Sequence, residues 1–393
     1  MKILILSFYY PPDLSAGSFR VASLIEAFAK NRDTNLEIDI ITTQPNRYAE
    51  VACQTKCVED YGWLRVRRIS LPKHDSGMKD QAKAFTVYAK QVLRISKNEK
   101  WDLVFASSSR LMTAALGAYI SKKQKTPLYL DVRDLFHDTM GDVLKNSRIK
   151  YILPIFKSLE KWTFKTASKI NVVSAGFSED LEQIAPVVPY STFTNGIDDP
   201  FLDYDFKKKP VSEKNLPVLL YAGNIGEGQG LHNIIPDMAK AFNGRLSIKI
   251  VGNGGRFEKL KASLSEDNKL INGVELAPPV RRSNLLEEYK NADILFLHLN
   301  NYDAFKKVLP SKIFEYAATG KPILAGVSGY SAEFLKKKIS NTVVFEPCNS
   351  DEMILAVEKM LLLPNHVDRR CFCEAYRRTN IMNKMVKDIL LIA

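Results

Sequence analysis

The chain has 393 residues, 46% of them hydrophobic and 25% charged, and a net charge of +12. This composition is typical of a folded globular protein, and the length predicts about two domains. The apolar run at residues 2–6 is too short for a signal sequence or a membrane span, and no other run is long enough to cross a membrane. The five cysteines match no metal-binding spacing, so we expect reduced thiols in a cytoplasmic protein.

The positive charge is confined to one part of the chain. Residues 61–170 contain 22 lysines and arginines against 9 aspartates and glutamates, which leaves a net charge of −1 for the rest of the chain. Such a field attracts a polyanion or an anionic membrane surface. No nucleic-acid-binding motif accompanies it, so we expect a membrane or a lipid-linked phosphate as the partner and no nucleic acid. Residues 63–68 and 79–100 are the predicted contact elements; a merely basic, solvated surface is the alternative.

Apolar, β-branched runs alternate with helical patterns along the whole chain. This alternation predicts parallel sheets covered by helices on both faces, and therefore an α/β fold. The predicted strands are residues 2–8, 36–43, 63–69, 103–107, 127–132, 169–174, 217–223, 246–251, 294–299, 322–326 and 342–346. The predicted helices include residues 18–30, 78–97, 149–167, 229–242, 283–290, 311–319, 350–363 and 367–391.

The alternation is interrupted at residues 200–216, where lysines and prolines replace apolar residues. We interpret this stretch as a linker between two doubly wound, Rossmann-like domains, residues 1–199 and residues 217–366. Ligands of such domains bind at the carboxyl ends of the strands, so we expect the two domains to face each other across a cleft that holds the site. The last helical stretch, residues 367–393, is expected to pack back toward the linker and the N-terminal domain.

The loop after the first predicted strand, residues 9–18, is long for a strand-to-helix connection. Gly17 precedes a helix that Ser18 is expected to cap, so the backbone there can approach a phosphate group closely. A glycine needed only for the turn is an equally good interpretation of this single residue.

A second loop, rich in glycine, opens the C-terminal domain. Residues 223–230 hold four glycines between a strand and a helix, together with Asn224 and Gln229. Gly252 and Asn253 repeat the pattern after the next strand. Such loops let the backbone approach phosphate groups, although the spacing is neither a dinucleotide fingerprint nor a P-loop. We predict a phosphate-binding loop; a flexible surface loop is the alternative.

Acidic, basic and imidazole groups converge at the end of another predicted strand. Asp131, Arg133, Asp134, His137 and Asp138 lie within eight residues. An imidazole beside a carboxylate can accept a proton from a sugar hydroxyl, so Asp134 and His137 are candidate catalytic residues. A salt-bridged strand end is the alternative. No D-x-D pair or second histidine accompanies these residues, so we expect no metal and no cofactor.

The most informative segment is residues 309–324, which predicts a turn, a short helix, a glycine stop and a buried strand. Lys312 and Glu315 are three residues apart and therefore share one face of the helix. A cation and a carboxylate beside a helix N-terminus can bind the diphosphate and the ribose hydroxyls of a nucleoside-diphosphate sugar. The segment follows the carboxyl end of a strand, which favours this interpretation over a surface ion pair.

Taken in order, these motifs resemble those of the family 4 retaining glycosyltransferases, which have the GT-B fold. The resemblance extends over the whole chain and is strongest to the bacterial O-antigen and surface-polysaccharide subgroup, including fucosaminyltransferase-like members. It is carried by P-P-x4-G-x2-R from Pro11 to Arg20, R-D-L-F at Arg133, V-S-x2-F at Val173, T-N-G-I-D at Thr194, the Gly223 loop, G-N-G at Gly252 and P-S-K-x2-E-Y-x3-G-K-P at Pro310.

The resemblance implies roles for single residues. Glu315 would accept hydrogen bonds from the ribose hydroxyls, while Gly17 and the start of the helix at Ser311 and Lys312 would approach the diphosphate. Residues after the strand at 246–251, among them Gly252 and Asn253, would border the nucleobase together with residues 274–280. The donor would be a nucleotide-diphosphate sugar and the acceptor a lipid-diphosphate-linked saccharide, with no metal.

The chain departs from the family pattern at three positions. Lys307 stands where the family has an acid, seven residues before the ribose-binding glutamate. Asn224 and Gln229 stand where many relatives have an arginine and a lysine that bind the diphosphate. We therefore hypothesise that Lys307 and Lys312, with backbone N–H groups, stabilise the leaving diphosphate instead.

The resulting prediction is a hexosyl or amino-sugar transferase of polysaccharide biosynthesis, peripheral to the inner face of the cell membrane. The family's retention implies front-face attack, in which the leaving diphosphate takes the acceptor proton, so the carboxylate-pair rule of glycosidases does not apply. One alternative is an isomerase similar to nucleotide-sugar 2-epimerases, against which the basic segment argues. The other is a non-catalytic nucleotide-sugar-binding subunit, which the two missing cations favour.

Overall fold

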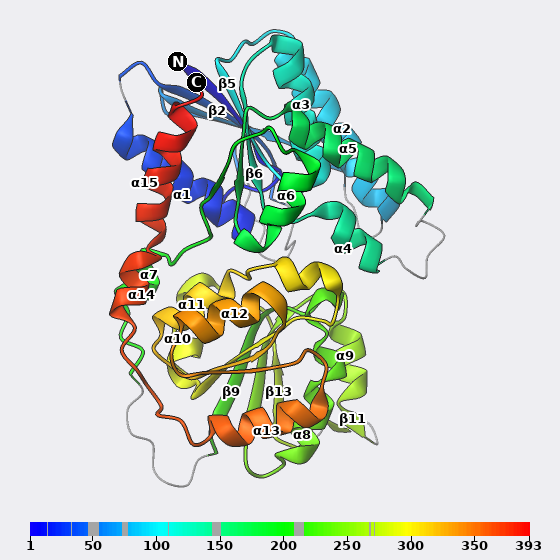
Figure 1. Ribbon diagram of the computed structural model, residues 1–393, viewed down its shortest axis with the longest axis vertical. Coiled ribbons are helices and arrows are strands. Elements are labelled where there is room, and N and C mark those ends of the chain that lie inside the picture. Colours follow the sequence, from blue (N-terminus) through cyan, green and yellow to red (C-terminus); the bar gives the residue numbers. More distant parts are fainter. Residues whose placement is uncertain are drawn as a thin grey trace. The chain divides into compact units, whose positions relative to one another are not determined.

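The computed structural model describes residues 1–13, 15–32, 34–45, 55–72, 78–108, 110–143, 151–207, 216–266, 269–270 and 272–393. The chain divides into two compact units, Met1–Asn195 with Arg378–Ala393, and Gly196–Arg377. Each unit is built on a mostly parallel β-sheet with helices on both faces (Figure 1). The predicted α/β fold with two doubly wound domains is therefore confirmed.

The first unit contains an eight-stranded sheet in the order β3-β4-β2-β1-β5-β6-β7-β8. All neighbours are parallel except β3, which pairs antiparallel with β4. Every residue of β5 and β6 is buried, as expected for parallel strands covered on both faces. The strands are β1 (Lys2–Leu6), β2 (Glu37–Thr43), β3 (Val58–Asp60), β4 (Leu64–Ile69), β5 (Leu103–Ser107), β6 (Leu128–Val132), β7 (Lys169–Val172) and β8 (Tyr190–Thr192).

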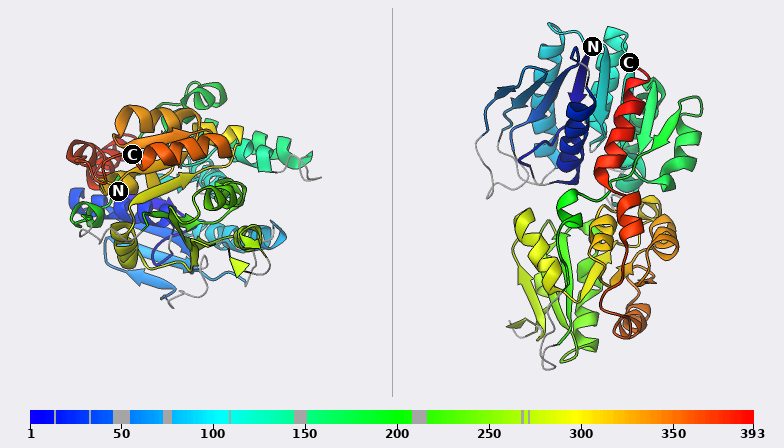
Figure 2. Two further views of the ribbon diagram at one scale, coloured as in Figure 1. Left: turned by 90° about the horizontal axis from the view of Figure 1, so that it is seen from below. Right: turned by 90° about the vertical axis from the view of Figure 1, so that its left-hand side faces the viewer.

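Two layers of helices cover this sheet. On one face α1 (Ala16–Asn31) and α15 (Arg378–Leu390) lie side by side (Figures 1 and 2). The Asp388 carboxylate of α15 accepts hydrogen bonds from Tyr129 of β6 (2.9 Å) and Ser191 of β8 (3.1 Å), which fixes the last helix to the sheet. The other layer holds α2 (Met78–Ser96), α3 (Leu111–Gln124), α5 (Leu153–Thr166) and α6 (Ser178–Ile184), and α4 (Phe136–Val143) packs against α5.

The second unit contains a parallel sheet in the order β13-β10-β9-β14-β15-β16. Alternate residues face two separate hydrophobic clusters, as the twofold period of a strand requires. Leu220 and Leu295 pack toward α10 (Arg282–Asn291), α11 (Lys312–Ala318) and α12 (Gly329–Lys338). Leu219 and Ile294 pack toward α8 (Ile235–Ala241), α9 (Phe257–Ser263) and α13 (Ser350–Met360). The strands are β9 (Val218–Asn224), β10 (Ser247–Asn253), β13 (Val274–Ala277), β14 (Ile294–His298), β15 (Ile323–Gly326) and β16 (Thr342–Phe345), with a separate pair β11 (Ser265–Glu266) and β12 (Lys269–Leu270).

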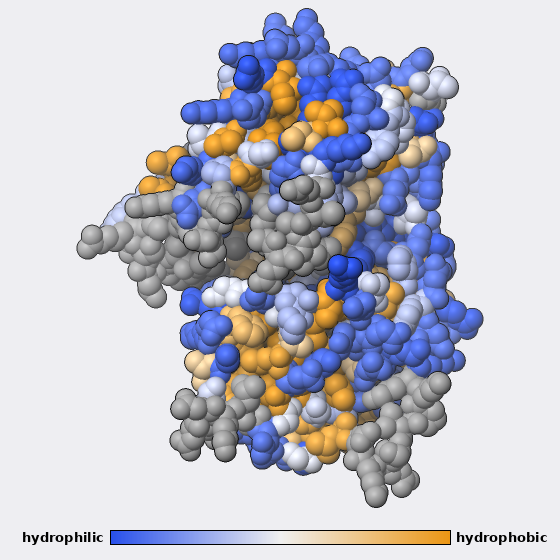
Figure 3. All heavy atoms as spheres, turned by 180° about the vertical axis from the view of Figure 1, so that it is seen from behind, coloured by the Kyte–Doolittle hydropathy of each residue, from blue (hydrophilic) through white to orange (hydrophobic). Residues whose placement is uncertain are grey.

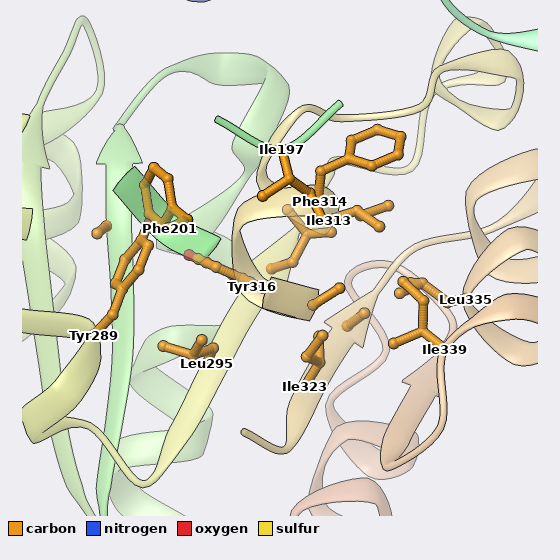
Figure 4. Close-up of a cluster of buried hydrophobic side chains, with 14 of the residues drawn as sticks. Ile197, Phe201, Tyr289, Leu295, Ile313, Phe314, Tyr316, Ile323, Leu335 and Ile339 are labelled. Carbon is orange, nitrogen blue, oxygen red and sulfur yellow. The ribbon is translucent and has the colours of Figure 1, made fainter. Parts of the chain in front are cut away.

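The helices of the second unit are mostly short. They are α7 (Asp199–Leu202), α8 (Ile235–Ala241), α9 (Phe257–Ser263), α10 (Arg282–Asn291), α11 (Lys312–Ala318), α12 (Gly329–Lys338), α13 (Ser350–Met360) and α14 (Arg370–Ala375). Figure 4 shows the cluster around α11, in which Ile313 and Tyr316 point toward Tyr289, Leu295 and Ile323.

All eleven predicted strands are present, but three predicted segments differ from the structure. The predicted helix 229–242 is broken into 3-10 turns η4 (Glu227–Gln229) and η5 (Leu231–Asn233) before α8, because Gly230 adopts φ +57°. The predicted helix 367–391 is divided into α14 and α15, which belong to different units. The predicted linker begins inside the second unit, since Phe201 and Phe206 are buried in its core; residues 208–215 lie outside the described residues.

Candidate functional site

The predicted site residues lie in both units, with Gly17, Asp134 and His137 in the first and the others in the second. In the second unit, β9 and β10 carry paired glycines one residue before their carboxyl ends, here called the glycine ends of the two strands. Gly223 and Gly252 are partners in the parallel register and have φ of +154° and +156°. A Cβ on Gly252 would lie 1.9 Å from the Gly223 carbonyl oxygen, so only glycine fits there.

The loop after β9 is tied together by its own side chains. The Gln229 Oε1 accepts hydrogen bonds from Asn224 Nδ2 (2.9 Å) and from the Gly226 N–H (3.1 Å), and Tyr221 donates its hydroxyl to the Asn224 carbonyl (2.6 Å). Asn224 and Gln229 are thus bonded to each other, and both are uncharged. The arrangement is that of an ordered loop, which argues against a flexible surface loop.

Residues after β14 hold the same loop from a second side. Asn300 donates from Nδ2 to the Glu227 carbonyl (3.0 Å) and from its backbone N–H to the Gly228 carbonyl (2.8 Å). His298, fully buried, bonds through Nδ1 to the Gln229 carbonyl (2.6 Å), while its Nε2 accepts from the Cys348 N–H (3.1 Å). Burial lowers the pKa of His298 to about 4, so the ring is neutral at pH 7. In the sequence, the only sign of a role for His298 was its position at the end of a predicted strand.

Helix α11 has one buried face and one face that carries the predicted ligand-binding groups. Ile313, Phe314 and Tyr316 are buried in the cluster of Figure 4, whereas Lys312 and Glu315 are half-buried. The Lys312 Nζ lies 5.9 Å from the centre of the Tyr221 ring.

The Lys312 amino group lies against the carboxyl end of β9. A Cβ on Gly223 would come within 2.2 Å of Lys312 Nζ. Burial lowers the pKa of Lys312, and the nearby Glu315 carboxylate opposes that fall. The predicted cation and the predicted glycine loop are therefore brought together.

Glu315 is positioned by residues that the sequence did not indicate. The buried Tyr289 donates its hydroxyl to Glu315 Oε2 (3.1 Å) across 26 residues of sequence. Burial lowers the pKa of Arg282, and the nearby Glu315 carboxylate opposes this fall. The Arg282 guanidinium also pairs with Asp198. A tyrosine and an arginine in an ordinary amphipathic helix carry no signal of this contact.

The other predicted residues of this segment have less specific surroundings. Lys307 ends the 3-10 helix η6 (Asp303–Lys307) and is half-buried. Ser311 is the N-cap residue of α11, but its side chain makes no capping hydrogen bond. Lys321 of the G-K-P motif is buried and donates to the Lys290 carbonyl at the end of α10 (2.9 Å), so this lysine supports the fold.

In the first unit, the predicted phosphate-approach loop leads into α1. Gly17 lies in the first turn of this helix. The cap prediction was wrong: Ser15, not Ser18, is the N-cap, and its hydroxyl accepts from the Ser18 N–H (3.1 Å). Ser15 is the first residue with extended backbone that precedes the helix, which is the geometry a cap requires.

The acidic block after β6 separates into a structural and an accessible part. Asp131 is buried and paired with Arg20 of α1 (2.8 Å), so it is not available to a ligand. Asp134 is exposed and is therefore the accessible carboxylate of the block. His137 Nδ1 lies 3.1 Å from Asp138 Oδ1, which gives the imidazole the carboxylate neighbour that its predicted role needs.

A buried carboxylate holds this block in place. The Glu160 carboxylate of α5, 3% exposed, accepts the Phe136 N–H (2.8 Å) at the start of α4, and the His137 N–H also contributes. Burial raises the pKa of Glu160 to about 7, although these two N–H groups oppose the rise. The segment with Asp134 and His137 is thus anchored to α5.

Replacing Glu160 by glutamine is expected to remove a pH dependence from the stability of the first unit. The folded-state pKa of about 7 lies above the ordinary 4.5, so the folded unit holds an extra proton between these values and its free energy of unfolding falls as the pH rises through this window. Glutamine keeps an acceptor oxygen and does not ionise, so the stability of the variant should not fall in this window. Across the window, its free energy of unfolding should therefore rise by about 2–3 kcal/mol relative to that of wild type.

Tryptophan fluorescence during urea unfolding is the measurement, because Trp63, Trp101 and Trp162, the three tryptophans of the chain, all lie in the first unit. The exposed Glu179→Gln of α6 is the control, and its pH profile should follow wild type. Parallel pH profiles for Glu160→Gln and wild type would contradict the assignment.

Among the residues that the structure describes, no three histidine, cysteine, aspartate or glutamate side chains are placed to hold a metal ion. No helix in the same ranges has both the length and the apolar character needed to cross a membrane.

Residues 204–377, nearly all of the second unit, match the family model described as glycosyl transferases group 1. WcaI of Escherichia coli strain K12, named for glycosyl transfer in colanic acid biosynthesis, is 27% identical over 179 residues, which cover 44% of this chain and 43% of WcaI. The lipopolysaccharide 1,2-N-acetylglucosaminetransferase of Salmonella typhimurium strain LT2 is 23% identical over 235 residues, which cover 55% of this chain and 59% of that enzyme. The chain thus spans about half the length of these curated relatives.

The crystal structure of HepE (Alr3699) from Anabaena in complex with UDP is similar over 99% of each chain, with a TM-score of 0.68 and 14% sequence identity. At this identity the likeness shows the fold alone. The chain therefore has the GT-B fold, and the similarity of its residues 204–377 is to the group 1 glycosyl transferases.

Proposed function

We propose that the chain is a retaining glycosyltransferase. It moves a hexosyl or amino-sugar unit from a nucleotide-diphosphate sugar to a lipid-diphosphate-linked saccharide in the synthesis of a bacterial surface polysaccharide, at the inner face of the cell membrane. The observation that carries the proposal is the placement of Lys312, whose amino group lies against Gly223 of β9, three residues before Glu315 on the same face of α11. The names of the curated relatives and the UDP bound to HepE support it. Within the family, the fucosaminyltransferase-like subgroup is the proposed place of the chain.

The proposed reaction needs no nucleophile from the protein. The acceptor hydroxyl oxygen bonds to the anomeric carbon on the face from which the diphosphate departs, the bond from that carbon to the diphosphate oxygen breaks, and the hydroxyl proton passes to the diphosphate. Glu315 accepts hydrogen bonds from the ribose, and Lys312 with Lys307 offsets the negative charge that develops on the leaving group. Asp134 and His137 orient the acceptor hydroxyl.

The proposal is tested in two steps. Thermal-shift measurements with a panel of nucleotide sugars identify the donor, because a ligand that binds the folded state raises its stability. Transfer from that donor to a lipid-diphosphate-linked saccharide is then measured, with the anomeric configuration of the product read by NMR. A product with the donor's configuration supports the proposal, and an inverted product overturns retention. Donor binding without turnover would assign a non-catalytic subunit, and epimerisation of the donor without an acceptor would assign an isomerase.

Replacing Glu315 by glutamine is expected to raise the KM for the donor about tenfold or more, with a smaller change in kcat. Glu315 contacts the ribose and not the reacting carbon, so its hydrogen bonds contribute about equally before and during the reaction, and bonds to a charged acceptor are worth about 1.5–3 kcal/mol. Steady-state kinetics measures the effect. Tyr289→Phe, which frees one carboxylate oxygen, should shift KM in the same direction by less. The exposed Glu333→Gln of α12 is the control. An unchanged KM for Glu315→Gln would contradict the role.

A further inference from the structure

Three neighbouring helices of the first unit expose an almost uniform positive surface. Helices α2, α3 and α5 lie in one layer, with α3 in contact with both others. Their exposed basic side chains, with those of the turns that follow α2 and α3, are Lys83, Lys90, Arg94, Lys97, Lys100, Lys122, Lys123, Lys125, Lys157, Lys161 and Lys165. Over the same described residues the exposed acidic side chains are Asp80 of α2 and Asp102 in the turn after α2, since Glu160 is buried.

The charge of this layer differs from that of the neighbouring strand β4. Arg65, Arg67 and Arg68 of β4 all pair with carboxylates, at 3.0 Å to Asp60, 3.1 Å to Asp39 and 2.8 Å to Glu59, respectively. The predicted contact element at residues 63–68 is therefore largely neutralised within the fold. The element at residues 79–100 corresponds to α2 and keeps its exposed charge.

Apolar side chains are exposed at the start of α5, beside its lysines. Tyr151, Ile152 and Ile155 are 77%, 39% and 67% exposed. Lys157, Lys161 and Lys165 follow at intervals of four and so form one stripe along the helix. Figure 3 shows that apolar residues also break the hydrophilic surface of this unit elsewhere, so exposure alone does not mark a site. The distinguishing feature at α5 is the apolar end joined to a stripe of cations.

We infer that the α2–α3–α5 layer is the surface by which this protein docks on an anionic lipid bilayer, with Ile152 and Ile155 entering the headgroup region and the lysines contacting lipid phosphates. A bilayer accepts both kinds of side chain, because it offers negative charge at its surface and apolar matter just below. A nucleic acid would use the cations but gives Ile155 no apolar environment. The inference deepens the proposed function and rests on it, because an enzyme with a membrane-bound acceptor must dock on the membrane.

The test is flotation of the full-length protein with vesicles. Wild type is expected to float with vesicles of phosphatidylglycerol and phosphatidylcholine, less with added salt, and not with phosphatidylcholine alone. The triple variant Lys157→Gln, Lys161→Gln, Lys165→Gln should bind at least about tenfold more weakly, since each cation near the surface contributes about 1 kcal/mol. Ile155→Gln should also weaken binding while leaving all of the charge in place.

Matched changes in the second unit are the controls. Lys336→Gln, Lys337→Gln, Lys338→Gln on α12 removes the same charge from another exposed helix, and Leu355→Gln on α13 changes a side chain that is 70% exposed. Both are expected to float like wild type. Loss of binding in the α12 triple variant equal to that in the α5 variant would overturn the inference, since net charge would then suffice. If wild type binds DNA but does not float with vesicles, and the α5 variant does not bind DNA, the surface would be assigned to a polyanion instead.

Turnover with a water-soluble acceptor separates this inference from the proposed function. The α5 variants should keep wild-type turnover without lipid, because none of their residues belongs to the proposed site. Flotation without any transferase activity would leave the docking surface standing and remove the proposed function. Transfer without flotation would leave the proposed function standing and remove the docking surface.

Discussion

Replacing Arg20 by alanine is expected to lower the free energy of unfolding of the first unit by about 3–5 kcal/mol. The Arg20 guanidinium is 1% exposed and donates from Nε and Nη2 to both oxygens of Asp131, at 2.8 and 2.9 Å. It also donates to the carbonyls of Phe193 and Thr194, each at 2.8 Å. Alanine would leave the Asp131 carboxylate buried without its cation, and two carbonyls with fewer donors. Urea unfolding followed by tryptophan fluorescence measures the loss in this unit.

The control is Arg65→Ala, which removes an arginine from an exposed ion pair of the same unit. Arg65 and Asp60 are 44% and 46% exposed, so its loss is expected to cost no more than about 1 kcal/mol. Adding Asp131→Asn to Arg20→Ala should restore part of the stability, because no charge then remains buried. Equal losses for Arg20→Ala and Arg65→Ala would contradict the structural role of Arg20.

Arg20 illustrates which parts of the structure follow from sequence pattern and which do not. The motif from Pro11 to Arg20 helped to indicate the family, yet the arginine's partner, Asp131, lies 111 residues away, and no periodicity links the two. The strands were predictable because short apolar runs and β-branched composition are local properties of the sequence. The breaks at Gly230 and between α14 and α15 were not, because a left-handed glycine and a change of unit depend on tertiary contacts.

The candidate site shows the same division. Lys312 and Glu315 were predictable from their spacing on a short helix after a strand. The residues that support them were not predictable. Tyr289 orients Glu315, and His298 holds the glycine loop. Both come from other elements, so their contacts form only when the sheet is assembled. The substitution of both expected cations by Asn224 and Gln229 was visible in the sequence. Their mutual hydrogen bond, which keeps the loop ordered without charge, was not.

Replacing Lys312 by methionine is expected to lower kcat by roughly a hundredfold to a thousandfold, which corresponds to about 2–4 kcal/mol of transition-state stabilisation. Methionine retains an apolar chain of similar length, so packing against Tyr221 and Gly223 is largely kept and the change acts on the charge. Since Asn224 and Gln229 are uncharged and bonded to each other, the positive charge beside Gly223 of β9 comes from Lys312. Because negative charge grows on the diphosphate as the glycosidic bond breaks, kcat should fall more than KM rises.

Two further variants separate the charge of Lys312 from its position. Gly223→Ala keeps the charge but places a Cβ 2.2 Å from the present position of the Lys312 Nζ. The φ of +154° at this position also disfavours alanine. The variant should therefore lower kcat as well, because it displaces the amino group. The exposed Lys306→Met of η6 removes one positive charge close by in sequence and should change kcat by less than about twofold, because a screened surface charge contributes little. Near-wild-type turnover in both Lys312→Met and Lys307→Met would show that neither lysine stabilises the leaving group. In that case backbone N–H groups at the glycine ends of β9 and β10 and at the start of α11 would have to supply the stabilisation without a cation.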